Sequence, residues 1–125
     1  MTLSVSTQVN PIADKLVVQT DAKADPNNNV LGTTAKVFMV NVDNSANPGV
    51  AAFVKLYDDP APIVGTTLPV MVFMCPGSLN RTLAIPEGVE IPGMSMACTT
   101  SGGTEGNQSL ANPVVVQILA TAIPS

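Results

Sequence analysis

The sequence predicts an all-β protein: a single β-sandwich of the immunoglobulin-like or jelly-roll type, with about seven or eight short antiparallel strands and an N-terminal extension. Three observations predict this fold. Valine is very frequent whereas the helix formers Glu and Lys are scarce, which is typical of strands. Apolar and polar residues alternate with a period of two in many segments, as they do in half-buried strands. The 11 prolines and 9 glycines interrupt these segments at short intervals, as turns between strands do.

Two parts of the chain are expected. Residues 1–34 are predicted to form an N-terminal strand or arm followed by a polar loop, and residues 35–125 are predicted to form the body of the sandwich. Within the first part, Leu3, Val5 and Val9 alternate with polar residues. This spacing predicts an opening strand, and Asn10-Pro11 is expected to interrupt it.

The rest of the N-terminal part is less regular. Residues 16–19 form a short apolar run that fits either a strand or one loose helical turn. Residues 20–34 are the longest polar stretch, and they contain Asp25-Pro26-Asn27-Asn28-Asn29. Asn and Asp favour turns because their side chains bond to the local backbone. We therefore expect residues 20–34 to form an exposed loop or a mobile connection.

The first strands of the body follow. Residues 35–42 are apolar on both faces, which favours a central strand, and Asn47-Pro48-Gly49 suits a type II turn. Residues 50–57 alternate, and the predicted core face comprises Val50, Ala52, Val54 and Leu56. Phe53 and Tyr57 lie on the other face, which is either an exposed contact surface or a second buried face.

Residues 58–67 are expected to form a Pro/Gly loop. Another alternating face then follows, formed by Leu68, Val70, Val72 and Met74. Pro69 predicts that this strand lies at an edge or carries a bulge, because proline cannot donate to the ladder.

The last third is expected to contain three strands. The first is predicted over residues 79–85, and Pro86-Glu87-Gly88 and Pro92-Gly93 are expected to form two turns after it,. In the next strand, the side chains expected to face inward are Met94, Met96 and Cys98. Residues 99–112 are predicted to be a polar loop, and residues 114–121 the last strand.

Charge narrows the range of functions. Charged residues make up 11% of the chain, with five basic residues and a net charge of -4, which is less than half of the usual ~25%. Five basic residues are too few for the surface that nucleic-acid binding needs. We expect no membrane span, because no apolar run approaches the required ~20 residues, and the N-terminus lacks the pattern of a secretory signal. A surface rich in uncharged Thr, Asn and Ser loses its water at lower cost than a charged one, so it favours contact with other protein over a merely neutral surface.

Catalytic motifs are missing. The chain has no His, which excludes conventional Ser-His-Asp and Cys-His machinery, and it contains neither a phosphate-binding loop nor a dinucleotide fingerprint. Asp58-Asp59 is the nearest approach to a carboxylate cluster, with Glu87 and Glu90 elsewhere. A calcium site needs about six oxygen ligands, so two adjacent aspartates are interpreted as the start of a solvated loop. We expect no catalytic, cofactor-binding or metal-binding residues.

Sulfur-containing residues leave two alternatives open. Cys75 and Cys98 are interpreted as two small buried side chains, although they are far enough apart to form one disulfide. Four methionines lie on predicted strands, and they either fill the core or form a methionine-rich binding face: Met71, Met74, Met94 and Met96.

One group of residues carries a family resemblance, which covers about 70 residues between positions 50 and 121. Its parts are Val54-Lys55-Leu56-Tyr57-Asp58, Pro60, Pro62, Val64-Gly65-Thr66, Pro69, Pro86-Glu87-Gly88-Val89 and Gly93-Met94-Ser95-Met96-Ala97. In this order they resemble small β-sandwich structural proteins in the virions of tailed bacteriophages, of the capsid cement or decoration type.

The resemblance implies a non-enzymatic protein that stabilises the capsid from outside. Its partners would be the major capsid protein and further copies of itself, as a dimer or trimer, and it would be made in the host cytoplasm. Nucleic acid and membranes would not be partners. The alternative is a tail-fibre or receptor-binding head that recognises a host-surface glycan, with Asp58, Asp59 or the loop over residues 101–107 as its binding region.

Overall fold

The fold was established from a computed structural model, which describes residues 3–7 and 13–123. Eight strands and no helix occur in these ranges, so none of the described residues belongs to a helix that could span a membrane. The strands are β1 (Leu3–Thr7), β2 (Lys15–Gln19), β3 (Thr34–Asp43), β4 (Ala52–Tyr57), β5 (Met71–Cys75), β6 (Asn80–Ile91), β7 (Ser95–Thr99) and β8 (Val115–Ile123). The predicted all-β sandwich is confirmed.

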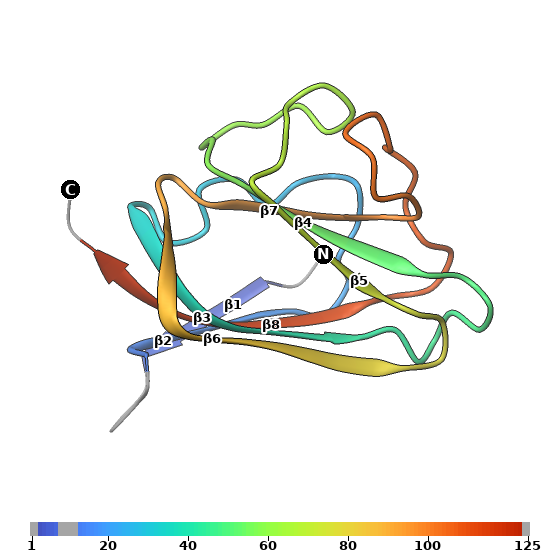
Figure 1. The fold of residues 1–125 in the computed structure, drawn as a ribbon, viewed down its shortest axis with the longest axis horizontal. Helices are drawn as coiled ribbons and strands as arrows, with labels where there is room; N and C mark the ends of the chain where they lie inside the picture. Colours follow the sequence, from blue (N-terminus) through green and yellow to red (C-terminus); the bar gives the residue numbers. More distant parts are fainter. Residues whose placement is uncertain (1–2, 8–12, 124–125) are drawn as a thin grey trace.

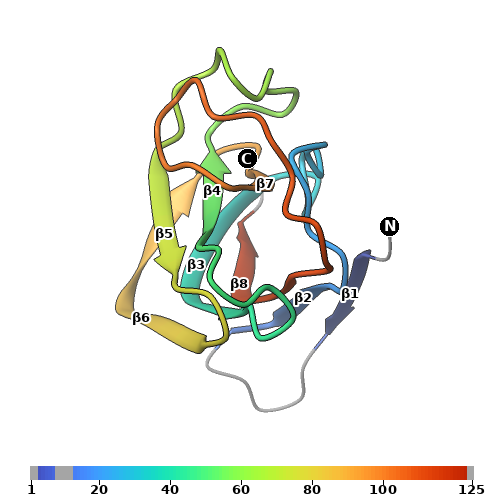
Figure 2. The ribbon, with the colours of Figure 1, turned by 90° about the vertical axis from the view of Figure 1, so that its right-hand side faces the viewer.

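Two antiparallel sheets form the layers. The larger sheet has the order β1-β2-β8-β3-β6, and the smaller one has the order β5-β4-β7. In Figure 1 the smaller sheet lies above the larger one, and Figure 2 shows the two layers from the side. β3 lies between β8 and β6, which confirms the central position that its apolar faces predict.

The strand pairing decides between the two sandwich types. β2 pairs with β8, β3 pairs with β6, and β4 pairs with β5. These pairs are nested within one another along the chain. Residues 22–30 add the missing pair, because they run along β7, where Asn27 and Met96 exchange two backbone hydrogen bonds of 2.8 and 3.0 Å. Pairing of first with last, second with second-last and so on is the arrangement of a jelly roll, and β1 extends its larger sheet.

The N-terminal part is integrated into this sandwich. Residues 16–19 form a strand, β2, which lies between β1 and β8. Residues 20–34 contain no regular strand before Thr34, in line with a loop, but the backbone is tied down: Cys98 donates to the carbonyl of Lys23, and Val30 donates to that of Met94. Of the two predicted alternatives, a loop is confirmed and a mobile connection is wrong for residues 22–30. The predicted roles of Val9 and Asn10-Pro11 lie outside the described residues.

Two further expectations are corrected in the body. Pro86-Glu87-Gly88 does not turn the chain away, because β6 continues through it to Ile91. The irregular stretch is absorbed as a bulge in the β3–β6 pairing, which bends an edge strand without ending it. Val50 is 43% exposed and precedes β4, so it does not belong to the core with Ala52. The type II turn is confirmed in its main feature, because Gly49 has a φ of 76°.

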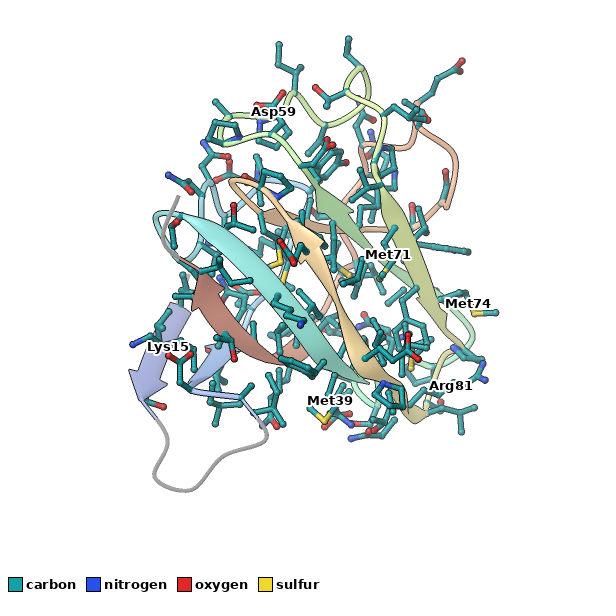
Figure 3. All side chains as sticks on the ribbon, turned by 60° about the vertical axis from the view of Figure 1, so that its left-hand side comes forward. Lys15, Met39, Asp59, Met71, Met74 and Arg81 are labelled. Carbon is teal, nitrogen blue, oxygen red and sulfur yellow. The ribbon has the colours of Figure 1, made fainter. Side chains whose placement is uncertain are left out.

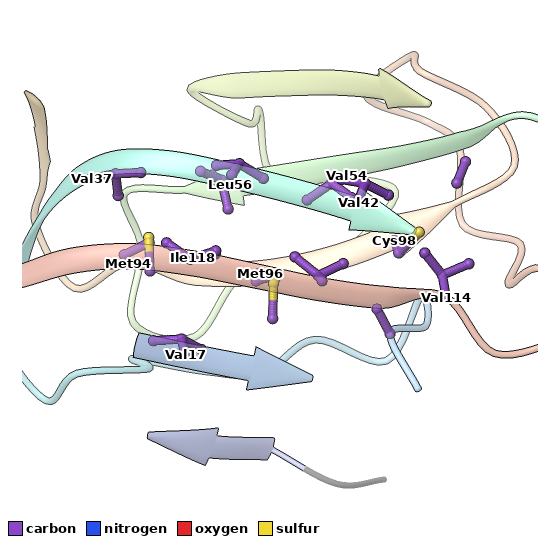
Figure 4. Close-up of a cluster of buried hydrophobic side chains, with 14 of the residues drawn as sticks. Val17, Val37, Val42, Val54, Leu56, Met94, Met96, Cys98, Val114 and Ile118 are labelled. Atoms are coloured by element: carbon purple, nitrogen blue, oxygen red, sulfur yellow. The ribbon is translucent and has the colours of Figure 1, made fainter. Parts of the chain in front are cut away.

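The core lies between the sheets (Figure 4). The larger sheet contributes Val17, Val37, Val42 and Ile118 among others, and the smaller sheet contributes Val54, Leu56, Met96 and Cys98. Met94, Met96 and Cys98 all face inward as predicted and are fully buried. Aliphatic and sulfur-containing side chains thus fill the sandwich almost without aromatic rings.

Candidate functional site

Strand β5 presents an apolar surface to solvent. Its outward residues and those of the flanking segments are 40–72% exposed, and we call them the β5 surface: Ile63, Leu68, Val70, Val72, Met74 and Leu79. In Figure 3, Met74 points away from the molecule. A single exposed apolar residue is ordinary, but a contiguous set of this kind marks an interaction site.

Charge is missing from this region. Residues 60–80 contain no Asp, Glu, Lys or Arg, and the nearest charged positions in the sequence are Asp59 and Arg81. These two lie at opposite ends of the molecule in Figure 3. Cores of protein interfaces are likewise depleted in charge, because burying an unpaired ion is unfavourable. The β5 surface therefore has the composition of an interface core.

β5 is also an edge of the smaller sheet, as Pro69 predicts. Its inward side chains, Met71 and Phe73, pack against the core, which leaves the alternate residues facing out. The outward residues consequently adjoin a strand edge that has no further strand beside it in the sheet order. Such an edge can accept another strand.

A second apolar feature lies on the outer face of the larger sheet. It is a cavity of about 340 Å³ lined by Phe38, Met39, Thr82, Ala84, Ile85, Pro86 and Leu119. Thr82 is the one polar residue in this lining. We call this feature the β3–β6 pocket. Its volume is at the lower end of the range for small-molecule sites, and its lining suits an apolar group.

The bulge creates this pocket. Val37 pairs with Val89 and Met39 pairs with Ala84, so Phe38 alone stands opposite residues 85–88. Gly88 has a φ of 75°, and a Cβ atom there would lie 2.8 Å from Cε of Lys36. Only glycine fits both conditions. The sequence signal for the pocket is the adjacent pair Phe38 and Met39, because two consecutive apolar residues share one face of a strand only at a bulge.

The outer face of β4 is closed rather than exposed. Tyr57 and Lys55 are fully buried and Phe53 is half-buried, so the exposed aromatic pair is wrong and the second buried face is confirmed. Lys55 Nζ donates to the carbonyl oxygens of Gly103 (2.7 Å) and Gly106 (2.9 Å). The lysine thereby holds the loop over residues 99–112 against the sheet.

Burial changes the ionisation of this face. Loss of water lowers the pKa of Lys55 and raises that of Tyr57, because a charge is poorly solvated there. The Tyr57 hydroxyl has no hydrogen-bond partner among the described residues. With both groups covered, this face supports the loops and is not accessible to a partner.

The residues considered for calcium or glycan binding do not come together. Asp59 accepts a hydrogen bond from the backbone N–H of Ala61, which makes it a local turn residue. Asp58 is exposed. No group of three or more potential metal ligands occurs within residues 3–7 and 13–123. In the loop, Ser101 and Gly103 serve as backbone acceptors for Thr99 and Lys55.

Both cysteines are buried, whereas the methionines lie partly in the core and partly on the surface. Cys75 and Cys98 are both free and buried, which confirms two buried thiols and rejects the disulfide. Burial raises the pKa of the Cys98 thiol from 9.0 to about 12. Met94 and Met96 fill the core as the simpler interpretation predicts, whereas Met74 belongs to the β5 surface.

No known protein family, curated protein or solved structure matches this chain.

Proposed function

We propose that this chain is a non-enzymatic structural protein of a tailed-phage virion, which decorates and stabilises the capsid exterior as a cement protein. The observation that carries the proposal is the β5 surface, where six exposed apolar side chains lie in a segment without any charge. A protein that assembles on a lattice needs surfaces that lose their water at low cost. Its partners are the major capsid protein and further copies of itself.

The position of the apolar features supports a role with several neighbours. The β5 surface belongs to the smaller sheet and the β3–β6 pocket to the outer face of the larger one. One molecule can therefore contact other protein from both layers. Jelly rolls are common in viral capsid proteins, and this analogy supports the proposal without defining the function.

The glycan-binding alternative has weaker support. Sugar-binding clefts generally present aromatic platforms, and the chain has one Tyr and no Trp. That Tyr57 is fully buried. Among the described residues, Asp58 and Asp59 do not form a group with a third Asp, Glu, Cys or His side chain, so nothing in the charged residues favours a calcium-dependent sugar site.

The test is cosedimentation of the purified protein with empty capsid shells of the phage that encodes it, beside isolated tails of the same phage and a glycan array with and without calcium. We expect saturable binding to shells at a fixed number of copies per capsid subunit, and no binding to tails. Electron microscopy of the intact particle locates the protein independently. Binding to tails or to glycans, with none to shells, would overturn the cement role in favour of the receptor-binding one.

A further inference from the structure

The free strand edges of this sandwich are protected unequally. Natural proteins guard such edges with charges, prolines, bulges or covering segments, since an open edge recruits other strands. The β7 edge is covered by residues 22–30. The β6 edge is bulged at Pro86 and Gly88 and is flanked by the charged residues Arg81, Glu87 and Glu90.

No segment of residues 3–7 or 13–123 is bonded along the β5 edge, and residues 60–80 carry no charge. Pro69 stands before the strand and Pro76 follows it, so the residues between them keep their amide donors. Four outward apolar side chains accompany this edge, namely Leu68, Val70, Val72 and Met74. The described part of β1 exposes Leu3 and Val5, which alternate with Ser4 and Ser6. β5 is thus the less protected of the two apolar edges.

We propose that two copies of this chain associate through antiparallel pairing of their β5 edges, which joins the two smaller sheets into one continuous six-stranded sheet. This inference rests on the proposed function, because it names the interface for self-association. The sheet order becomes β7-β4-β5 in one copy followed by β5-β4-β7 in the other.

A second copy satisfies every condition that the β5 edge sets for its partner. The partner strand must have an open edge, an apolar outward face and no charge that would be buried. β5 itself has all three. A two-fold axis perpendicular to the sheet keeps the outward faces of both copies on the same side, as isologous symmetry requires. The apolar side chains of one copy then meet those of the other.

The side chains also select the register. Directly opposite residues in an antiparallel pair point to the same face, so an outward residue must stand opposite an outward residue. Placing the two-fold axis at Val72 sets Val72 opposite itself and Val70 opposite Met74. A shift of the axis to Phe73 would set Val72 opposite Met74 and Val70 opposite the half-buried Pro76, so two pairs of exposed apolar residues would face each other instead of three. The register centred on Val72 therefore buries more of the exposed apolar surface.

The test uses sedimentation equilibrium of the whole protein and charge variants at the axis. We expect the wild type to be a dimer. Val72→Lys and Val72→Glu each place two like charges opposite one another, so each should raise the dimer dissociation constant by roughly 100-fold or more. Because Val72 is 41% exposed, both variants should remain folded, as circular dichroism verifies.

Mixing the two variants tests the register. Lys and Glu then stand opposite each other across the axis, and opposite charges in directly facing positions attract. We expect an equimolar mixture to form a heterodimer although neither variant dimerises alone. Val50→Lys is the matched control: Val50 has nearly the same exposure, 43% against 41%, but lies outside the β5 strand, so this variant should dimerise like the wild type.

Two results would overturn the inference: a monomeric wild type at high micromolar concentration, or a Val72→Lys variant that self-associates as strongly as Val50→Lys. A mixture that stays monomeric would overturn the register centred on Val72. These failures are distinguishable from failure of the proposed function. A monomer that still binds capsid shells leaves the cement role standing, whereas a β5-linked dimer that ignores shells leaves the interface standing.

Discussion

β7 and β5 form the two edges of the same three-stranded sheet, and the chain treats them in opposite ways. All five residues of β7 are buried, whereas Val72 and Met74 of β5 are exposed. The β7 edge is covered by the chain's own residues 22–30, which bond to it through backbone and side-chain groups. The β5 edge has no such cover from the part of the chain that the structure describes.

This difference shows that an open edge is not a consequence of the fold. The connection between β2 and β3 is long enough to cover one edge, and its backbone supplies the donors and acceptors that pair with the β7 segment. The loop before β5 could have carried charges at no cost to the core, yet residues 60–80 carry none. Since edge protection is easily encoded, its absence at β5 favours an edge that is used for contact.

The comparison predicts that the same substitution destabilises the protein strongly on β7 and hardly at all on β5. Met96 of β7 is 1% exposed and Met74 of β5 is 40% exposed. Met96→Ala should lower the free energy of unfolding by about 2–5 kcal/mol, because it leaves a cavity in the core. Met74→Ala should change it by less than about 0.5 kcal/mol at protein concentrations too low for self-association. Urea denaturation followed by circular dichroism measures both, and equal losses would contradict the difference in packing between the edges.

A smaller effect is expected from the cover of β7. The Ser95 hydroxyl donates to the carbonyl of Asp59 (2.6 Å) and accepts from the backbone N–H of Asn29 (2.9 Å). Ser95→Ala should therefore lower the free energy of unfolding by about 1–3 kcal/mol, since two backbone groups lose their partner. Ser4→Ala on the exposed part of β1 is the control, with an expected change below about 0.5 kcal/mol. A loss at Ser95 no greater than at Ser4 would mean that this hydroxyl does not hold the covering segment.

The alternation of apolar and polar residues predicted the strands at both edges, but it did not predict which segments pack against them. It placed Met94, Met96 and Cys98 on one face, because only one face of β7 is uniformly apolar. On β5 both faces are apolar, and alternation does not say which of them lies inside. The face of β5 that lies inside is decided by the packing of segments far away in the sequence, and a local pattern carries no information about that packing.

The same limit applies to the candidate site. Lys55 is bonded to Gly103 and Gly106, in a loop that follows it by about half the length of the body, so its own neighbourhood in the sequence carries no sign of burial. Pro86-Glu87-Gly88 has the composition of a turn, but pairing of β6 with β3 keeps the backbone in the sheet and converts the turn into a bulge. The β3–β6 pocket follows from that conversion. The sequence does show that residues 60–80 carry no charge, and the proposed contact through the β5 surface depends on this property.

The smallest of the expected effects compares the two buried thiols, Cys75 on β5 and Cys98 on β7. Burial raises the pKa of both, and for Cys98 from 9.0 to about 12. The unfolded chain therefore releases the Cys98 proton first as the pH rises above 9, and stability that is fully present below pH 9 is lost between pH 9 and 12. By pH 10 this loss amounts to about 1 kcal/mol for one thiol.

Cys98→Ala isolates that contribution. The substitution lowers stability at every pH because it removes a buried side chain, but it should reduce the drop in unfolding free energy between pH 8 and pH 10 by about 1 kcal/mol. Cys75 and Tyr57, whose pKa values are also raised, and Lys55, whose lowered pKa acts in the opposite direction, are present in both proteins. The measured difference therefore reports the Cys98 thiol together with its electrostatic interaction with Cys75 and Lys55. An unchanged drop would show that the β7 thiol ionises as readily in the folded protein as in the unfolded chain, which is incompatible with a β7 strand sealed on both faces and along its edge.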